Sequence, residues 1–245
     1  MSVLLRILYI LYSICIATPL FVVATIITAF VVVTAAMMGD DKFIAYWAPH
    51  FWSRFTCFIY LIKVKVTGRE KLDKQQSYVF LANHQGYFDI FLIYGYLGHN
   101  LKWMMKEYLK KIPFVGYACQ KSNQVFVGNS LASILETVKQ AQKTLREGMS
   151  LVIFPEGTRT HDGKMQPFKK GAFTLANEIG LPLVPMTING SFQVYNRKAK
   201  LVHFGKLSLT VHDPITAEQR KGIPTKKIMD KAYDIIHNDL QPEFQ

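Results

Sequence analysis

Cysteine is scarce in this chain and never closely spaced. The three cysteines, Cys15, Cys57 and Cys119, lie far apart and form no C-x-x-C pair. This spacing excludes a disulfide framework and offers no ligand set for a structural zinc ion. The H-E-x-x-H pattern of zinc hydrolases is also missing, so we expect no metal. The low, odd number is typical of a reducing compartment, with all three as small buried or lipid-facing residues.

Charge is nearly missing from the first 40 residues. Between Val3 and Met38 the only charged residue is Arg6. A continuous helix over this leader would be roughly 50 Å long, whereas the hydrocarbon core of a bilayer is about 30 Å thick. We therefore expect either a re-entrant hairpin that bends at Pro19, or a span formed by Leu20–Met38 with the first half at the interface. A cleaved signal peptide is the alternative, although its apolar core is usually only about 7–15 residues long.

The positive charge lies entirely behind this leader. The net charge is +12, and residues 1–50 sum to zero, so residues 51–245 carry all of it. A basic domain suits nucleic acid, an acidic membrane face or a phosphorylated substrate. No nucleic-acid-binding motif is present, and the apolar leader favours the membrane. Basic residues between Lys63 and Lys74 predict, by the positive-inside tendency, a main domain that faces the cytoplasm.

The remainder alternates short apolar runs with helical patterns. Aromatic residues are dense from Tyr46 to Tyr60, which suits the headgroup level of a membrane or a buried helix equally well. The pattern predicts strands at residues 78–82, 101–105, 124–127, 150–154, 183–188 and 207–212, and helices at 131–145, 171–178 and 226–240. We expect an α/β fold with a mainly parallel sheet flanked by helices, preceded by a membrane-embedded helical segment. We expect the chain to divide into a hydrophobic membrane anchor or helical hairpin at residues 1–45 and one domain at residues 46–245.

The first polar cluster directly follows a predicted buried strand. The segment Asn83–Asp89 comes after residues 78–82, and sites in open α/β sheets form at the carboxyl ends of strands. On one regular helix His84 and Asp89 would point about 140° apart. We therefore expect His84 on the turn and Asp89 in the first winding of a helix, with Gly86 giving the turn its freedom. Asp89 would then orient His84 as a general base. A turn histidine beside a helix-capping aspartate is the alternative.

The second polar cluster also follows a predicted strand and reads Phe154-Pro155-Glu156-Gly157-Thr158-Arg159. Gly157 allows a tight approach of the backbone, and Thr158 adds a hydroxyl. Arg159 offers the planar fork that suits a phosphate. Glu156 is expected to accept from a substrate hydroxyl or to hold Arg159. A surface turn with a local Glu–Arg pair is the alternative.

Together the two clusters closely resemble the glycerolipid acyltransferase family, that of the 1-acylglycerol-3-phosphate (lysophosphatidic acid) acyltransferases. This family carries a His-x4-Asp box preceded by Asn, and then a Phe-Pro-Glu-Gly-Thr-Arg box. Here these are Asn83–Asp89 and Phe154–Arg159. Lys106–Gly116 looks like the stretch between the boxes, and Leu183-Val184-Pro185 looks like the later Val-Pro block. The resemblance spans roughly residues 65–190 of the sequence.

The resemblance implies a membrane-bound acyltransferase domain at 46–245 that converts lysophosphatidic acid to phosphatidic acid in phospholipid biosynthesis. His84 would take the proton from the acceptor hydroxyl, and Asp89 would orient and charge-stabilise His84. Glu156 and Arg159 would position the acceptor with Gly157, Thr158 and Lys106. The donor would be an acyl thioester, acyl-CoA or acyl-ACP, with no other cofactor and no metal. Membrane lipids and acyl carrier protein are the implied partners, and nucleic acid is not.

One departure from the family leaves the acceptor open. The family usually places an arginine after the strand that follows the Pro-Phe-x-Gly segment, whereas residues 125–129 read Val-Phe-Val-Gly-Asn. That block is associated with the acceptor's phosphate, so another lysolipid, such as an amino-acid-based one, is the alternative acceptor. No G-x-S-x-G elbow and no obvious nucleophilic cysteine is present, so no acyl-enzyme is required. Outside enzymes, the alternative is a non-catalytic basic module that binds membranes.

Overall fold

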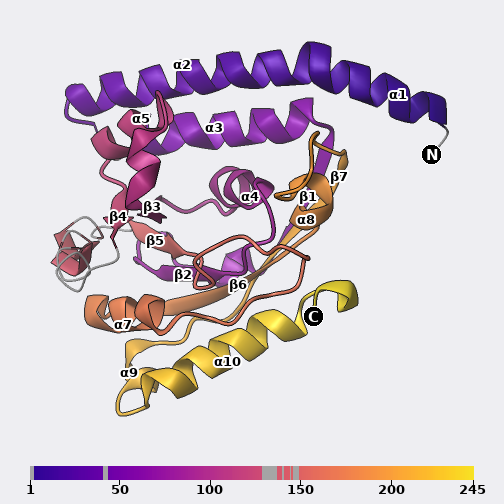
Figure 1. The fold of residues 1–245 in the computed structure, drawn as a ribbon. Coiled ribbons are helices and arrows are strands. Elements are labelled where there is room, and N and C mark those ends of the chain that lie inside the picture. The colour runs from indigo at the N-terminus through magenta and orange to yellow at the C-terminus, as the bar shows by residue number, and fades with distance from the viewer. Residues whose placement is uncertain (1–2, 41–43, 129–136, 140, 144, 146–148) are drawn as a thin grey trace.

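The fold is seen in a computed structural model, which describes residues 3–40, 44–128, 137–139, 141–143, 145 and 149–245. Figure 1 shows a sheet between helical layers, with α2 and α3 along one side and α7 and α10 along the other. The strands are β1 (Ile62–Thr67), β2 (Val79–Ala82), β3 (Leu101–Lys106), β4 (Val125–Val127), β5 (Ser150–Ile153), β6 (Leu183–Asn189) and β7 (Gly205–Val211). The predicted α/β class is therefore confirmed.

The helices connect these strands. They are α1 (Val3–Tyr12), α2 (Thr18–Met37), α3 (Ile44–Ile59), α4 (Phe88–Tyr96), α5 (Val115–Lys121), α7 (Lys170–Ile179), α8 (Ser191–Tyr195), α9 (Ala217–Arg220) and α10 (Thr225–Asn238). Shorter turns are the π-helix η1 (Ser13–Ala17) and the 3-10 helices η2 (Arg69–Lys71), η3 (Glu107–Lys111) and η4 (Pro242–Phe244). The helix predicted at 131–145 falls mostly outside the described residues.

The sheet has the strand order β1-β7-β6-β2-β5-β3-β4. The five strands from β6 to β4 pair in parallel, while β7 runs antiparallel to β6 and carries β1 parallel to itself. Each strand predicted from the sequence is present within a residue or two of its expected ends. β2 and β5 are direct neighbours, so the two polar clusters leave adjacent strands at the same edge of the sheet.

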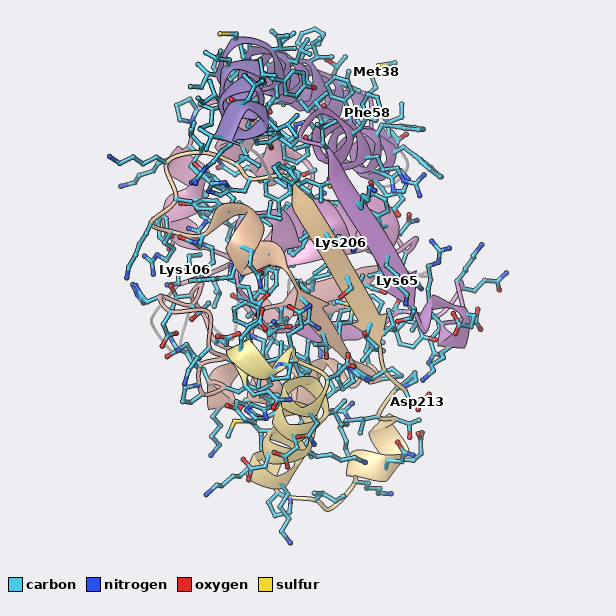
Figure 2. All side chains as sticks on the ribbon, turned by 90° about the vertical axis from the view of Figure 1, so that its right-hand side faces the viewer. Met38, Phe58, Lys65, Lys106, Lys206 and Asp213 are labelled. Carbon is cyan, nitrogen blue, oxygen red and sulfur yellow. The ribbon has the colours of Figure 1, made fainter. Side chains whose placement is uncertain are left out.

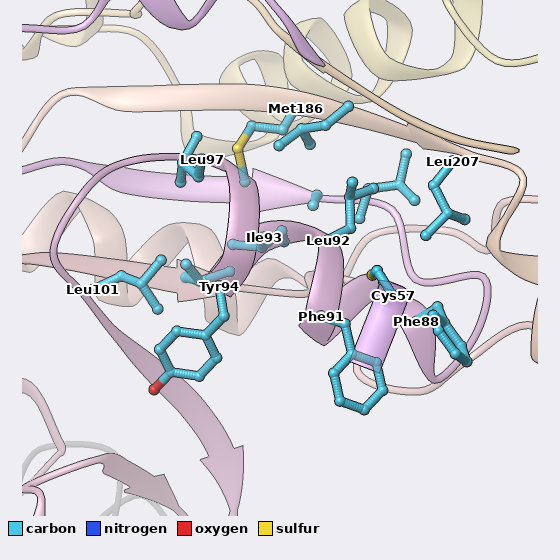
Figure 3. Close-up of a cluster of buried hydrophobic side chains, with 14 of the residues drawn as sticks. Cys57, Phe88, Phe91, Leu92, Ile93, Tyr94, Leu97, Leu101, Met186 and Leu207 are labelled. Carbon is cyan, nitrogen blue, oxygen red and sulfur yellow. The ribbon is translucent and has the colours of Figure 1, made fainter. Parts of the chain in front are cut away.

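Alternating side chains of the central strands fill two separate cores. Phe80 and Ala82 of β2 join the core under α4, whereas Val79 and Leu81 join the core under α7 and α10. This is the period-two alternation of a strand covered on both faces. Figure 3 shows the first core, where Leu92 of α4 lies among side chains from several elements. Because both faces are packed, the sheet is a rigid base for the segments that leave its edge.

Of the two arrangements expected for the leader, the hairpin at Pro19 is not formed, and the span by Leu20–Met38 alone stays a prediction. Residues 3–37 run as one helix, α1 through η1 to α2 (Figure 1), which is long and apolar enough to cross a membrane. Pro19 is the second residue of α2 and lies just after η1 inside this continuous helix, so its missing backbone N–H falls where the α-helical bonding pattern is already interrupted. A π-helical turn absorbs such an irregularity inside a continuous helix. The chain reverses direction after Met38, and α3 packs along α2 on its way back. The domain division at 45/46 stays a prediction.

The aromatic segment after the leader is both a packed helix and an exposed surface. Tyr46 and Cys57 of α3 are buried, while Phe51 and Phe58 are exposed on its other face. The interpretation as a buried helix is therefore confirmed for one face, and the headgroup interpretation of the exposed face stays a prediction. The following strand β1 was not predicted, although Lys63 and the next lysine alternate with apolar residues there. Figure 2 shows Lys65 of β1 and Lys206 of β7 on these neighbouring strands.

Candidate active site

The site begins where β2 ends, at a side chain that continues the sheet. Asn83 is almost fully buried. Its amide nitrogen donates to the Ile188 carbonyl at 2.9 Å, and its amide oxygen accepts from the Ile188 N–H at 2.7 Å. Asn83 thus reproduces both halves of a backbone pairing to β6 with its side chain, after the β2 ladder has ended. The direction in which His84 leaves the strand is fixed by these two bonds.

His84 and Asp89 meet as the sequence predicts. His84 lies on the turn, and Asp89 lies in the first winding of α4. The His84 Nδ1–H donates to Asp89 Oδ2 at 2.7 Å, and the Gly86 N–H donates to the same oxygen at 3.0 Å. The Asp89 side chain is fully buried and that of His84 is 15% exposed. The carboxylate therefore fixes the tautomer, and within the described residues His84 Nε2 makes no hydrogen bond. The contact is confirmed, whereas the catalytic role stays a prediction.

Gly86 is the position at which this turn touches α8. A Cβ atom built there would lie 2.6 Å from the Ser191 carbonyl oxygen and 2.8 Å from the Tyr195 carbonyl oxygen, which no side chain tolerates. The Tyr87 N–H donates to that Tyr195 oxygen at 3.2 Å. The glycine thus serves close packing, because its φ is not among the positive ones. The turn and α8 are consequently held as one unit.

An aromatic stack sets the plane of the His84 ring. The ring lies 3.8 Å from the Phe154 ring, centroid to centroid, with an angle of only 8° between the planes. Trp103 stacks on Phe154 in turn, at 5.6 Å and 25°. The hydrogen bond to Asp89 and this stack together restrain both side-chain torsions of the histidine. The sequence placed Phe154 in the second cluster but gave it no role, and Trp103 was missed.

Glu156 joins the two clusters through the backbone. Its Oε1 accepts from the His84 N–H at 2.7 Å, and its Oε2 accepts from the Gln166 N–H at 2.8 Å. The Thr160 N–H donates to the His84 carbonyl at 2.9 Å and closes the connection. Within the described part of the chain no ion pair joins Glu156 to Arg159, so the expected role of holding Arg159 is wrong. The whole Glu156 residue is only 2% exposed. Its carboxyl group instead accepts a hydrogen bond from the main chain of His84.

Burial raises the pKa of Glu156 to about 8, although the two backbone N–H groups act in the opposite direction. A carboxyl group whose folded pKa lies above its ordinary value of 4.5 keeps its proton when the unfolded chain has lost it. The free energy of unfolding must then fall as the pH rises between these two values.

Glu156→Gln is expected to remove that dependence. Thermal unfolding of the wild type and of the variant, followed from pH 5 to pH 9, should show the wild type losing stability relative to the variant up to about pH 8, with a constant difference above it. Two curves that stay parallel over the whole range would show that Glu156 is ionised throughout.

The rest of the second cluster forms a tight turn with an exposed rim. Gly157 has a φ of +72°, a left-handed conformation that suits glycine, and its N–H donates to the Phe154 carbonyl at 2.9 Å. Thr158 is exposed. The Arg159 guanidinium lies 3.6 Å from the centroid of the Tyr87 ring, a cation–π contact that aims it back over the first cluster. The structure thus brings Arg159 beside the turn that carries His84.

Lys106 ends a different strand from the two that lead into the polar clusters. It is exposed at the carboxyl end of β3, the strand on the other side of β5 from β2, and Figure 2 labels it. Its binding role stays a prediction. Two residues near Thr158 were missed by the sequence reasoning, Arg197 and His161, because both come from segments without a motif. No group of three or more potential metal ligands occurs among the described residues.

Comparison with known proteins identifies the family. Residues 63–189, just over half of the chain, match the family model for acyltransferases. The chain belongs to the acyltransferase family. A relative from Brassica napus, "1-acyl-sn-glycerol-3-phosphate acyltransferase BAT2, chloroplastic", is 32% identical over 62% of this chain and 45% of its own length. The 1-acyl-sn-glycerol-3-phosphate acyltransferase of Saccharomyces cerevisiae is 29% identical over 76% of this chain and 65% of its own length. The chain thus spans about half to two thirds of these curated acyltransferases.

One solved structure shows the same acyltransferase fold. The crystal structure of the 1-acyl-sn-glycerophosphate (LPA) acyltransferase PlsC from Thermotoga maritima superposes with a TM-score of 0.78. The match covers 95% of this chain and 93% of that one, at 24% sequence identity. Because it extends over nearly the whole chain, the likeness includes the leader as well as the sheet.

Proposed function

We propose that this acyltransferase moves a fatty acyl group from an acyl thioester to the free hydroxyl of lysophosphatidic acid, which forms phosphatidic acid. The observation that carries the proposal is the pair His84–Asp89, bonded at 2.7 Å at the carboxyl end of β2. A histidine with one nitrogen held by a buried carboxylate and the other without a partner is the arrangement of a general base. The names of the relatives favour this acceptor, and Arg159 supplies a cation for its phosphate.

The chemistry needs no covalent intermediate with the protein. Nε2 of His84 takes the proton of the acceptor hydroxyl as its oxygen attacks the thioester carbonyl carbon. Asp89 stabilises the imidazolium that forms. The tetrahedral intermediate collapses with cleavage of the C–S bond, and His84 returns its proton to the departing sulfur, which leaves as a thiol. The plane of the His84 ring is already fixed. The remaining rate gain comes from proximity, because donor and acceptor are bound next to this base.

Either coenzyme A or acyl carrier protein suits the thioester, since both present the same reacting group. The leader helix is mostly exposed and apolar, which supports membrane attachment at the place where the lipid acceptor resides. We further propose that the catalytic domain faces the cytoplasm, on the strength of the basic residues that follow the leader.

Arg159→Ala is expected to raise the KM for lysophosphatidic acid by roughly 10- to 100-fold, the scale of a lost charge-assisted phosphate contact, with a smaller change in kcat. Steady-state kinetics with the acceptor varied at saturating donor would measure this. Glu178→Ala provides a control at an exposed charge in the last turn of α7. An unchanged acceptor KM in Arg159→Ala would remove its phosphate role.

The acceptor itself is tested with a panel. Detergent-purified protein would receive lysophosphatidic acid or other lysolipids, each with acyl-CoA and with acyl-ACP. The fastest transfer is expected to lysophosphatidic acid. Transfer only to another lysolipid would keep the chemistry and move the acceptor, in line with the arginine that residues 125–129 lack. Lipid binding without any transfer would favour the non-catalytic membrane module.

A further inference from the structure

A second arginine reaches the second cluster from a distant segment. Arg197 follows α8 and is exposed. Its Nη1 donates to the Thr158 hydroxyl at 3.3 Å and to His161 Nε2 at 3.1 Å. Among the described residues neither Arg197 nor Arg159 has a carboxylate within ion-pair distance. Arg197 therefore contacts the residue next to Arg159, and neither guanidinium group is neutralised by a carboxylate of the described residues.

The two arginines are linked by a closed ring of contacts. Arg159 lies over the Tyr87 ring at 3.6 Å, and Tyr87 packs against the Tyr195 ring at 5.0 Å. Tyr195 precedes Arg197 by two positions, and Arg197 returns to Thr158, the neighbour of Arg159. Tyr87 is the N-cap residue of α4, the helix whose first turn carries Asp89, so these contacts are attached to the same turn as the candidate base.

The turn that presents Arg197 is built in advance. The Asn196 side-chain oxygen accepts from the N–H groups of Lys198 and Ala199, at 2.9 and 3.1 Å, and its amide donates to the Phe192 carbonyl at 3.0 Å. Such an asparagine turn holds the backbone on both sides of Arg197. Binding a ligand therefore orders the arginine side chain but not its backbone, which lowers the entropy cost of binding.

We propose that Arg197 is a second acceptor-binding residue, which holds the phosphate monoester together with Arg159. This rests on the proposed function and specifies its substrate site. Two planar forks that approach from different elements match the several oxygens of a phosphate monoester, whereas an uncharged glycerol headgroup offers neither arginine a partner. Arg197 thus selects lysophosphatidic acid over the corresponding monoacylglycerol. Arg197 would thus take the place of the arginine that the family usually has near residues 125–129 and that this chain lacks there.

The test measures binding rather than turnover. The full chain carrying His84→Ala, purified in detergent, would be titrated with short-chain lysophosphatidic acid and with the monoacylglycerol of the same chain. On this parent, Arg197→Ala and Arg197→Gln are each expected to weaken lysophosphatidic acid binding by about tenfold, the scale of one charge-assisted hydrogen bond, and to leave monoacylglycerol binding unchanged. Arg197→Lys should keep part of the affinity.

Two comparisons make the outcome decisive. Glutamine can still donate to Thr158, so full affinity in Arg197→Gln would show that the arginine only supports the turn and would overturn the proposal. Lys198→Ala removes a neighbouring exposed cation; an equal loss there would mean that overall charge, not Arg197, attracts the ligand. If the His84→Ala protein binds both lipids equally, lysophosphatidic acid is not the preferred acceptor, and the role of Arg197 in binding it is refuted as well. Arg197-dependent binding without transfer by wild type would refute only the proposed function.

Discussion

His84→Ala is expected to lower kcat by about 10³- to 10⁴-fold while leaving the fold intact, because general-base catalysis contributes on that scale. The imidazole is the group whose free nitrogen, Nε2, takes the proton of the acceptor hydroxyl. Its partner Asp89 cannot act in its place, since the carboxylate is fully buried. The affinity for the acceptor should change little, because Arg159 and not His84 carries the charge for the phosphate.

The fold of the variant can be checked independently of activity. The side chain of His84 stacks on one face against Phe154, and its loss leaves the bonds of its backbone to Glu156 and Thr160 in place. Circular dichroism and thermal unfolding should therefore resemble the wild type. His203→Ala serves as the matched histidine control, since His203 is exposed and bonds Val194 only through its backbone N–H. A His84→Ala enzyme with kcat within tenfold of the wild type would remove His84 from the chemistry.

Asp89→Asn is expected to lower kcat by about 10²- to 10⁴-fold, since losing the charge of a triad aspartate costs rate on this scale. The amide has nearly the same shape as the carboxylate, and its oxygen can still accept from His84 Nδ1 and from Gly86 N–H. What it cannot do is stabilise the imidazolium. The variant therefore separates the charge of Asp89 from its role in building the turn.

The acceptor KM and a surface control variant complete the test of Asp89. Acceptor KM should stay near that of the wild type, because Asp89 is buried and has no route to the substrate. Asp213→Asn is the matched control, since the Asp213 side chain is 85% exposed and forms an ion pair with Lys71. If Asp89→Asn retained more than a tenth of the wild-type kcat, the carboxylate would be a helix cap with no catalytic part.

Local features of the site could be predicted because their partners lie close in the sequence. His84 and Asp89 are five residues apart, and the turn between them leaves few ways to meet. The strands were predictable from apolar runs, and each cluster from its place directly after one. Fold class followed from the alternation of these runs with helices.

Partners from distant segments could not be predicted in this way. The bonds of Asn83 join residues 105 positions apart, and the bond from His84 N–H to Glu156 joins residues 72 apart. Both depend on which strands become neighbours. No local sequence pattern predicts the strand order β6-β2-β5. For the same reason Glu156 was expected to hold nearby Arg159, whereas the fold places it against the backbone of His84.

The bend predicted at Pro19 and the missed strand β1 are errors of the same kind. Pro19 was given too much weight, since the π-helical turn η1 directly before α2 absorbs the irregularity without ending the helix. The lysines of β1 were attributed to membrane topology alone, although lysine alternating with valine is also the pattern of an edge strand. In both places one physical effect was considered where two were acting.

Single-turnover kinetics would test the role of His84 most directly. Enzyme in excess over lysophosphatidic acid, with saturating acyl-CoA, would be quenched at short times, and the phosphatidic acid formed would be quantified for the wild type and for His84→Ala. Both should bind the acceptor with similar affinity, while the rate constant of the chemical step falls by about 10³-fold or more in the variant. Equal rate constants for acyl transfer in the two proteins would contradict the assignment of His84 as the base.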